Sequence, residues 1–298
     1  MMADQASRVT VIAGDIRRIR ANNPSPMTQS GTNSYLVGTG RLAVIDPGPD
    51  LADHRAAILA ALQPDEQIEV ILVSHCHLDH TALVPALAAL TGAKVLAYGP
   101  ARSGRSAQMQ KLAAAGLTGG GEGLDLDFRP DATLRDGDII ALGASRIEVL
   151  HTPGHTGCHL CFGVGDRLFS GDHVMGWSTS LISPPEGDMT DYMTSLRRLA
   201  AREWQQFLPG HGEVVPDPAQ RIADLVAHRT AREAEILASL TGGPMSPAEI
   251  TARLYVDIPA ALLPAAQRNV LAHLIDLTVR AHVTCPALPS PDAHFRLR

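Results

Sequence analysis

The chain has 298 residues, of which 45% are hydrophobic and 19% are charged, and its formal net charge is -6. This composition excludes a disordered chain and a strongly basic nucleic-acid-binding protein, and the length suits one large domain, alone or with a smaller one. A membrane helix needs ~18 consecutive apolar residues, and no segment approaches that length. The polar start at residues 1–5 also lacks the pattern of a secretory signal. We therefore expect a cytoplasmic protein without membrane contact.

Short strands and helices alternate through the first two thirds of the sequence. Strand patterns cover residues 8–19, 33–37, 42–45, 68–73 and 94–98, and helical patterns cover 51–62 and 81–90. Further strands are predicted at 139–142, 146–150, 160–164 and 167–170, before a helix at 189–203. This order predicts an α/β protein with layered helices and sheets.

The sequence after residues 216–218 (Pro-Asp-Pro) has a helical pattern. Helices are predicted at 219–240, 247–254 and 265–281, and the Ser246 to Glu249 spacing is that of a capping box. Two short extended pieces follow at 282–286 and 294–297. We therefore predict a first domain at 1–218 and a winged-helix-like domain at 219–298.

Histidines gather where the predicted strand 68–73 ends. The run His-Cys-His-Leu-Asp-His places four potential metal ligands, His75, His77, Asp79 and His80, within residues 75–80. Imidazole and carboxylate groups suit zinc, and a turn after a strand lets neighbouring side chains converge. Cys76 is expected to point away from them, since alternate residues of a strand face opposite sides.

Further ligand-type residues follow later strands. They are His155, Asp172 and His211, each beside glycine in a turn-like segment. Any one of them alone would be read as a surface or core residue, but the whole set favours a metal site. The spacing of Cys158 and Cys161 is a weaker signal, because on the strand predicted there the two would face opposite sides.

These motifs, in this order and spacing, resemble the metallo-β-lactamase-fold hydrolase superfamily over about residues 8–215. A narrower resemblance is to the β-lactamase-like protein 2 branch, which carries a C-terminal winged-helix-like piece. The segments that carry it are 31–37, 151–156 and 184–189. The resemblance implies an αββα sandwich with a small C-terminal winged-helix-like domain.

The resemblance also implies two metal sites. The first would contain His75, His77 and His155, the second Asp79, His80 and His211, and Asp172 would bridge the two ions. Two divalent ions, expected to be zinc, would hold a hydroxide that attacks a carbonyl carbon or phosphorus. Asp79 and Asp172 are the expected catalytic residues, since they would anchor both the metals and the attacking group.

Four further residues are candidates for supporting roles. Asp46 ends a predicted strand, and in this superfamily such an aspartate typically holds the ring of a ligand histidine; a simple turn-capping role is the alternative. Asn33, His173 and Tyr192 are candidates for the substrate pocket, and His159 carries no functional assignment.

Several functions remain open for this site. We expect hydrolysis of a small ester, thioester or lactone. The alternative is a phosphodiesterase or endoribonuclease acting on single-stranded nucleic acid, and less favoured are a β-lactamase or a binding module without catalysis. The expected partner is a small-molecule substrate, and nucleic acid is the alternative.

The C-terminal segment bears on these alternatives. Residues 219–298 hold eight arginines and seven acidic residues, which is thin support for nucleic-acid binding. A solvated segment that builds a homodimer is the preferred interpretation. Since every candidate ligand precedes it, we also expect this segment to leave the metal ligands in place and to act on substrate handling or assembly.

Overall fold

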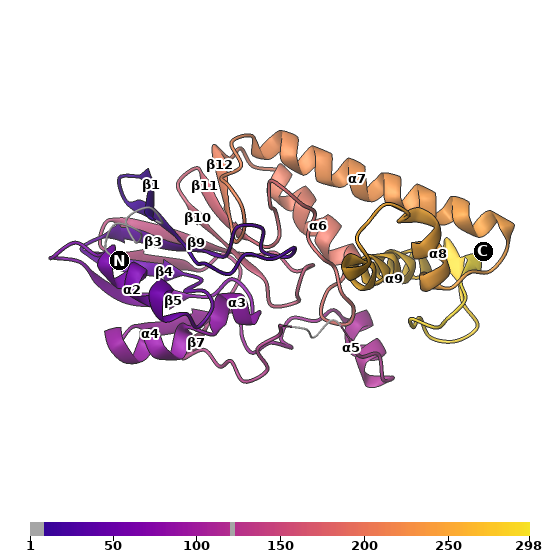
Figure 1. Cartoon of the computed structure of the whole chain (residues 1–298), viewed down its shortest axis with the longest axis horizontal. Coiled ribbons are helices and arrows are strands. Elements are labelled where there is room, and N and C mark those ends of the chain that lie inside the picture. Colours follow the sequence, from indigo (N-terminus) through magenta and orange to yellow (C-terminus); the bar gives the residue numbers. More distant parts are fainter. Residues whose placement is uncertain (1–8, 120–122) are drawn as a thin grey trace.

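The computed structural model describes residues 9–119 and 123–298. The polar start at 1–5 and residue 8 of the first predicted strand lie outside these residues. Two sheets form the centre of the larger part of the chain (Figure 1). The first sheet has seven strands in sequence order: β1 (Val9–Ala13), β2 (Ile16–Arg20), β3 (Asn33–Thr39), β4 (Arg41–Ile45), β5 (Gln67–Leu72), β6 (Lys94–Ala97) and β7 (Ala132–Thr133).

The second sheet has five strands. Their spatial order runs from β12 (Gln206–Pro209) through β11 (Arg167–Gly171), β10 (Leu160–Val164) and β9 (Ser145–His151) to β8 (Ile139–Leu142). The pair β11 and β12 is parallel, whereas the other neighbours are antiparallel. In the first sheet, the pairing is antiparallel from β1 to β4 and parallel from β4 to β7.

Alternating side chains of β4 show how the layers are built. Leu42 and Val44 pack against the helices α2 (Ala52–Ala60) and α4 (Val84–Thr91). Ala43 and Ile45 point the other way, into the core between the two sheets. Because both faces of this strand are covered, its residues form a continuous apolar run rather than an alternating one.

The outer face of the second sheet is covered by α6 (Met189–Ala200) and by the start of α7 (Pro218–Ser239). The layers are therefore helix, sheet, sheet, helix, and the predicted αββα sandwich is confirmed. The predicted helix 81–90 is wrong in one respect, because the chain forms a short α3 (Leu78–Thr81) and a separate α4. Pro85, in the first turn of α4, suits a helix start, where a missing N–H leaves no bond unmade.

The C-terminal part contains the long α7, α8 (Pro247–Leu254), α9 (Leu263–Val279) and a two-stranded sheet of β13 (Val283–Thr284) and β14 (Arg296–Leu297). The Ser246–Glu249 capping box is present as predicted. A helix absent from the sequence interpretation, α5 (Ala107–Ala114), also packs in this core through Met109 and Leu112. Figure 1 shows α7 running from the end of β12 along the whole C-terminal part.

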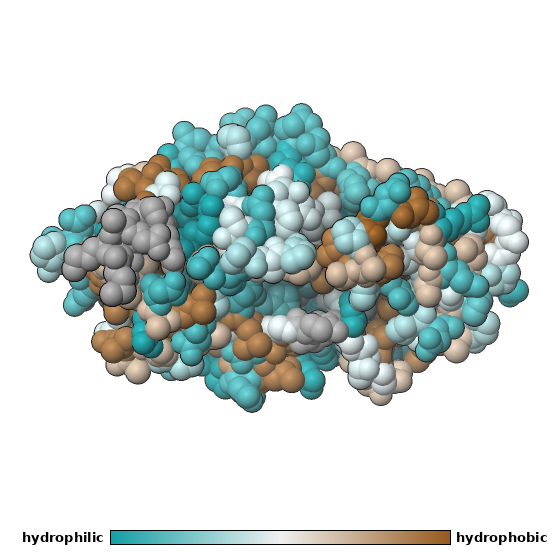
Figure 2. Space-filling view, viewed as in Figure 1, coloured by the Kyte–Doolittle hydropathy of each residue, from teal (hydrophilic) through white to brown (hydrophobic). Residues whose placement is uncertain are grey.

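The surface shows small hydrophobic groups interspersed with hydrophilic residues over the face drawn in Figure 2. Among the described residues, no helix combines the length and apolar character needed to cross a membrane.

Removing one large side chain between the sheets tests their packing. Phe162 is fully buried there with Leu160 and Phe169. We expect Phe162→Ala to lower the free energy of unfolding by about 3–5 kcal/mol, because it removes buried apolar area and leaves a cavity. Urea denaturation measures the loss, and Ile139→Ala, at a half-exposed position, is the control that should cost far less. Equal losses in the two variants would contradict this packing.

Candidate metal centre

The histidine run lies where β5 ends and the chain turns into α3. β5 is flanked by the parallel strands β4 and β6, so the following residues emerge at one edge of the sheet. His75 and His80 are buried there, and His77 immediately precedes α3. Cys76 points into the hydrophobic core as predicted, where its sulfur lies 3.8 Å from that of Cys158.

Three loops of the second sheet meet this run. His155 comes from the loop between β9 and β10, Asp172 directly follows β11, and His211 follows β12. All three are buried. Seven residues predicted from the sequence as metal ligands are thus brought together at one end of the two sheets.

Three imidazoles form a first donor set. His77 Nδ1 lies 2.9 Å from His75 Nε2 and 3.1 Å from His155 Nε2. Nitrogens that approach so closely without a proton between them repel each other, whereas a cation among them would be favoured. These three residues form one of the groups whose donor atoms could hold a single ion.

A second donor set contains Asp79, His80 and His211. Asp79 Oδ2 lies 3.2 Å from His211 Nε2 and 3.6 Å from His80 Nε2. The same carboxylate oxygen accepts a hydrogen bond of 3.2 Å from the Thr32 hydroxyl.

Asp172 lies between the two sets. Its Oδ2 is 3.9 Å from Nε2 of both His75 and His155, and 3.3 Å from His211 Nε2. Its Oδ1 is 3.6 Å from His80 Nε2. One carboxylate is therefore within 4 Å of imidazoles from both donor sets, as expected of a group shared by two ions.

Burial sets the protonation of the first donor set. It lowers the pKa of His77 to about 3, with help from the neighbouring His155. It also lowers the pKa of His75 and that of His155. These imidazoles are therefore neutral, which is the form that binds metal ions.

Nearby carboxylates set the protonation of the histidines in the second donor set. Burial acts to lower the pKa of His211, but Asp172 and Asp79 together outweigh it and raise that pKa to about 9. Asp79 and Asp172 likewise raise the pKa of His80 against the effect of burial. Burial would raise the pKa of Asp172 itself, but His211 and His80 hold it well below its usual range. His80 and His211 also hold the pKa of Asp79 below its usual range against the effect of burial, so the two carboxylates are ionised.

Asp46 holds the ring of His80, as the resemblance implied. Asp46 Oδ2 lies 3.0 Å from His80 Nδ1, and the same carboxylate accepts bonds from the Ser74 backbone N–H (2.7 Å) and hydroxyl (2.6 Å). The Ser74 hydroxyl also lies 3.0 Å from His75 Nδ1. Asp46 adopts a positive φ of 51°, which is uncommon outside glycine. This conformation directs its carboxylate toward residues of the histidine run.

Asn33 supports His211 through the backbone. Its amide donates to the carbonyls of Pro209 (3.0 Å) and Gly212 (2.8 Å), on both sides of His211. Asn33 is fully buried, and through these bonds it braces the loop of a candidate ligand.

His173 and Tyr192 are also fully buried, behind the donor sets. Their rings contact each other with centroids 4.8 Å apart. Both side chains are therefore enclosed by protein in this structure.

His159, which had no assigned role, does contact the centre. Its ring stacks on that of His75 with centroids 5.2 Å apart, and its Nε2 accepts the Asp172 backbone N–H at 3.3 Å. Thr152 Oγ1 lies 3.0 Å from its Nδ1. The sequence signal was a histidine in a buried, otherwise apolar strand segment, where a polar ring needs partners.

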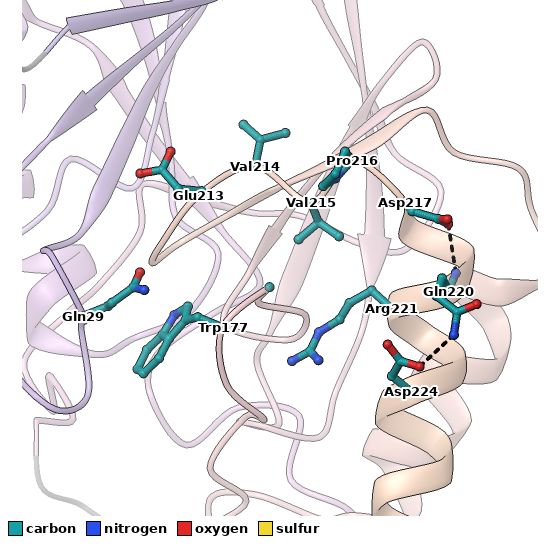
Figure 3. Close-up of a pocket in the computed structure, with 11 residues that line it drawn as sticks. Gln29, Trp177, Glu213, Val214, Val215, Pro216, Asp217, Gln220, Arg221 and Asp224 are labelled. Atoms are coloured by element: carbon teal, nitrogen blue, oxygen red, sulfur yellow. Dashed lines mark hydrogen bonds between the residues drawn. The ribbon is translucent and has the colours of Figure 1, made fainter.

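A cavity of about 370 Å³ opens beside the loop of His211 (Figure 3). It lies between the segment of Gln29, the Trp177 side chain and the first turns of α7, which contribute Arg221. A side-chain carbon at Gly212 would lie 2.5 Å from the Trp177 ring and 2.7 Å from Gln29. The cavity wall is therefore in direct contact with the residue that follows His211.

The donor sets fit metal ions on their own geometry. Two buried polar atoms at their centre, His80 Nε2 and Asp172 Oδ1, lack hydrogen-bond partners in the structure. Buried polar atoms are normally paired, and a cation between these two would satisfy both.

Comparison with known proteins agrees with this geometry. Residues 27–215 match the metallo-beta-lactamase superfamily. The chain belongs to this superfamily. Residues 246–283 match the beta-lactamase-associated winged helix domain, which confirms the predicted C-terminal fold.

Superfamily relatives extend over most of the chain. The Beta-lactamase-like protein 2 homolog of Drosophila melanogaster is 30% identical over 276 residues, which are 90% of this chain and 89% of the relative. An atrochrysone carboxyl ACP thioesterase of Aspergillus fumigatus is 27% identical over 272 residues, covering 85% and 77%. The predicted resemblance to the β-lactamase-like protein 2 branch is therefore confirmed.

A solved structure shows the same fold over nearly the whole chain. A beta-lactamase domain protein from Burkholderia ambifaria superposes with a TM-score of 0.79 at 22% identity, covering 97% of this chain and 93% of that one.

A substitution at Gly210 tests the candidate metal site without replacing any of the seven candidate ligands. A side-chain carbon at Gly210 would lie 2.5 Å from Asp172 Oδ1 and 2.8 Å from His80 Cε1. We expect Gly210→Ala to displace one of these groups and to weaken divalent-ion binding by about 10–100-fold, the range for residues that orient ligands. Competition with a chromophoric chelator measures the affinity. Gly14→Ala, where the added carbon meets no atom within 4 Å, is the control, and equal affinities in both variants would contradict the geometry.

Proposed function

We propose that this superfamily hydrolase uses two divalent cations, zinc being the expected pair, to hydrolyse a thioester or ester of a small acid. The observation that carries the proposal is the position of Asp172, whose carboxylate approaches imidazoles of both donor sets. Nitrogen and oxygen donors without cysteine suit zinc and leave room for a reacting group.

The residues that would hold the cations follow from the two donor sets. His75, His77 and His155 would bind one, Asp79, His80 and His211 the other, and Asp172 both. Bound there, two cations acidify water and stabilise the negative charge that develops on an attacked carbonyl oxygen.

The protein's own groups orient the reactants. The ionised carboxylates of Asp79 and Asp172 accept hydrogen bonds from a water that enters between the donor sets, and so direct its lone pair toward the substrate. Asp46 and Ser74 keep the rings of His80 and His75 in place. Because these groups are already fixed by hydrogen bonds, little reorganisation is needed during reaction.

Two observations support a thioester or ester substrate. One relative is named an ACP thioesterase. The cavity beside Gly212 also combines apolar walls, including Trp177 and Val215, with polar and charged side chains such as that of Arg221. Apolar walls with polar groups among them suit an acyl group carrying a polar end.

The arrangement of arginines weighs against nucleic acid as the substrate. Arg229 is buried in the protein, and Arg280 forms ion pairs with Glu233 and Asp276. Arg232 stacks over the Tyr255 ring with its guanidinium 4.2 Å from the ring centroid. Arginines engaged in this way are not available to neutralise phosphates. A complete donor set likewise favours catalysis over a binding module.

Asp172→Ala tests the proposed function. We expect the variant to lose at least about 10²-fold in turnover and to lose one of two bound metal ions, because the shared carboxylate contributes several kcal/mol to the reacting centre. Metal content by elemental analysis and rates on a panel of thioesters, esters, lactones, phosphodiesters and RNA are the measurements.

Asp166→Ala, an exposed aspartate paired with Arg167, is the control and should retain wild-type rates. Wild-type protein that takes up no zinc, iron or manganese would overturn the metal assignment. Activity confined to RNA or phosphodiesters would overturn the substrate assignment.

A further inference from the structure

The loop that follows β11 carries the shared carboxylate and also contacts the first donor set. It begins with Asp172 and continues to Leu181, whose carbonyl oxygen lies 2.7 Å from His155 Nδ1. A carbonyl can only accept, so His155 Nδ1 carries the proton and Nε2 is left to face His77. The position of the Leu181 carbonyl therefore sets both the tautomer and the direction of the His155 ring.

Two C-terminal side chains hold the residues on either side of Leu181. Arg229 of α7 donates a hydrogen bond to the Ser180 carbonyl. Asn269 of α9 accepts the Ile182 backbone N–H at 3.0 Å through its Oδ1. Arg229 Nη1 also donates to that Oδ1 at 3.2 Å, so the two side chains form one connected support.

The same support extends to Asp172. The Ser180 hydroxyl shares its one proton between the carbonyls of Asp172 (2.5 Å) and His173 (2.8 Å). A shift of Ser180 would therefore move the backbone of the shared carboxylate as well as the acceptor of His155.

The surroundings of Arg229 are not those of a residue selected for packing alone. It is 2% exposed, and its guanidinium contacts the Ser180 carbonyl, the Asn269 amide and the Tyr192 ring. These partners are all neutral. Burying a cation against neutral groups costs free energy that an apolar side chain of similar size would not.

We propose that Arg229 and Asn269 are positioning residues for the first metal-binding set, acting through Leu181 on His155. The inference rests on the proposed function, since it concerns how that function's metal site is held. All seven candidate ligands precede the C-terminal segment, and in this proposal the segment acts on the orientation of one of them.

The test measures two zinc affinities separately. Stepwise dissociation constants are determined for the full-length protein by competition with a chromophoric chelator, and His155→Ala identifies the constant that belongs to the first set. We expect Asn269→Leu and Arg229→Met to weaken that constant by about 10-fold or more. The constant of the Asp79, His80 and His211 set should change far less, because the support reaches that set only through the backbone of Asp172.

Two controls separate positioning from a loss of stability. Arg232→Met removes an arginine from the same helix, but one that contacts Tyr255 and Glu235, and it should leave both constants unchanged. Asn269→Asp retains the acceptor for Ile182 and Arg229 and should restore the first constant. Thermal unfolding is recorded for every variant.

The outcomes are distinct. Selective weakening of the first constant, with recovery in Asn269→Asp, supports the proposal. Wild-type constants in both Asn269→Leu and Arg229→Met overturn it, as do equal losses in both constants that follow the melting temperature. Failure of the wild-type protein to bind two ions would instead reject the proposed function.

Discussion

The carboxylate of Asp172 is the interaction on which the centre depends. It lies within 4 Å of imidazole nitrogens that come from the histidine run and from two separate loops. Four buried imidazoles around one buried carboxylate can be accommodated only if charges are balanced and each ring is held by a second hydrogen bond. Asp46, Ser74 and the Leu181 carbonyl provide such bonds for His80, His75 and His155. The loops that carry these groups must therefore be held in fixed positions, so that each hydrogen bond is formed.

The donor residues could be predicted from the sequence because their signals are local. Four of them lie within residues 75–80, immediately after an apolar strand, and the others follow strands beside glycine. Strand ends of a layered α/β fold meet at one edge, so the residue types and their places along the chain were sufficient. The role of Asp46, at the end of a predicted strand, was instead implied by the resemblance to the superfamily.

The support of these donors could not be predicted, and the reasons are physical. The acceptor of His155 is a backbone carbonyl, which every residue possesses, so Leu181 carries no signal in its residue type. Arg229 is 49 positions from the carbonyl that it reaches, and an arginine on a helix is normally solvated. The break between α3 and α4 was missed because apolar periodicity continued across it.

The contacts of Asn33 bear on the order in which parts of the protein fold. Its amide reaches the carbonyls beside His211 across 176 and 179 positions of the chain. Contacts between such distant residues form late in folding, because a large loop must close first. During synthesis, which proceeds from the N-terminus, the histidine run leaves the ribosome long before His211 can reach it. The nascent chain therefore exposes an incomplete set of imidazoles, and a cation captured at that stage would meet only part of its final ligands.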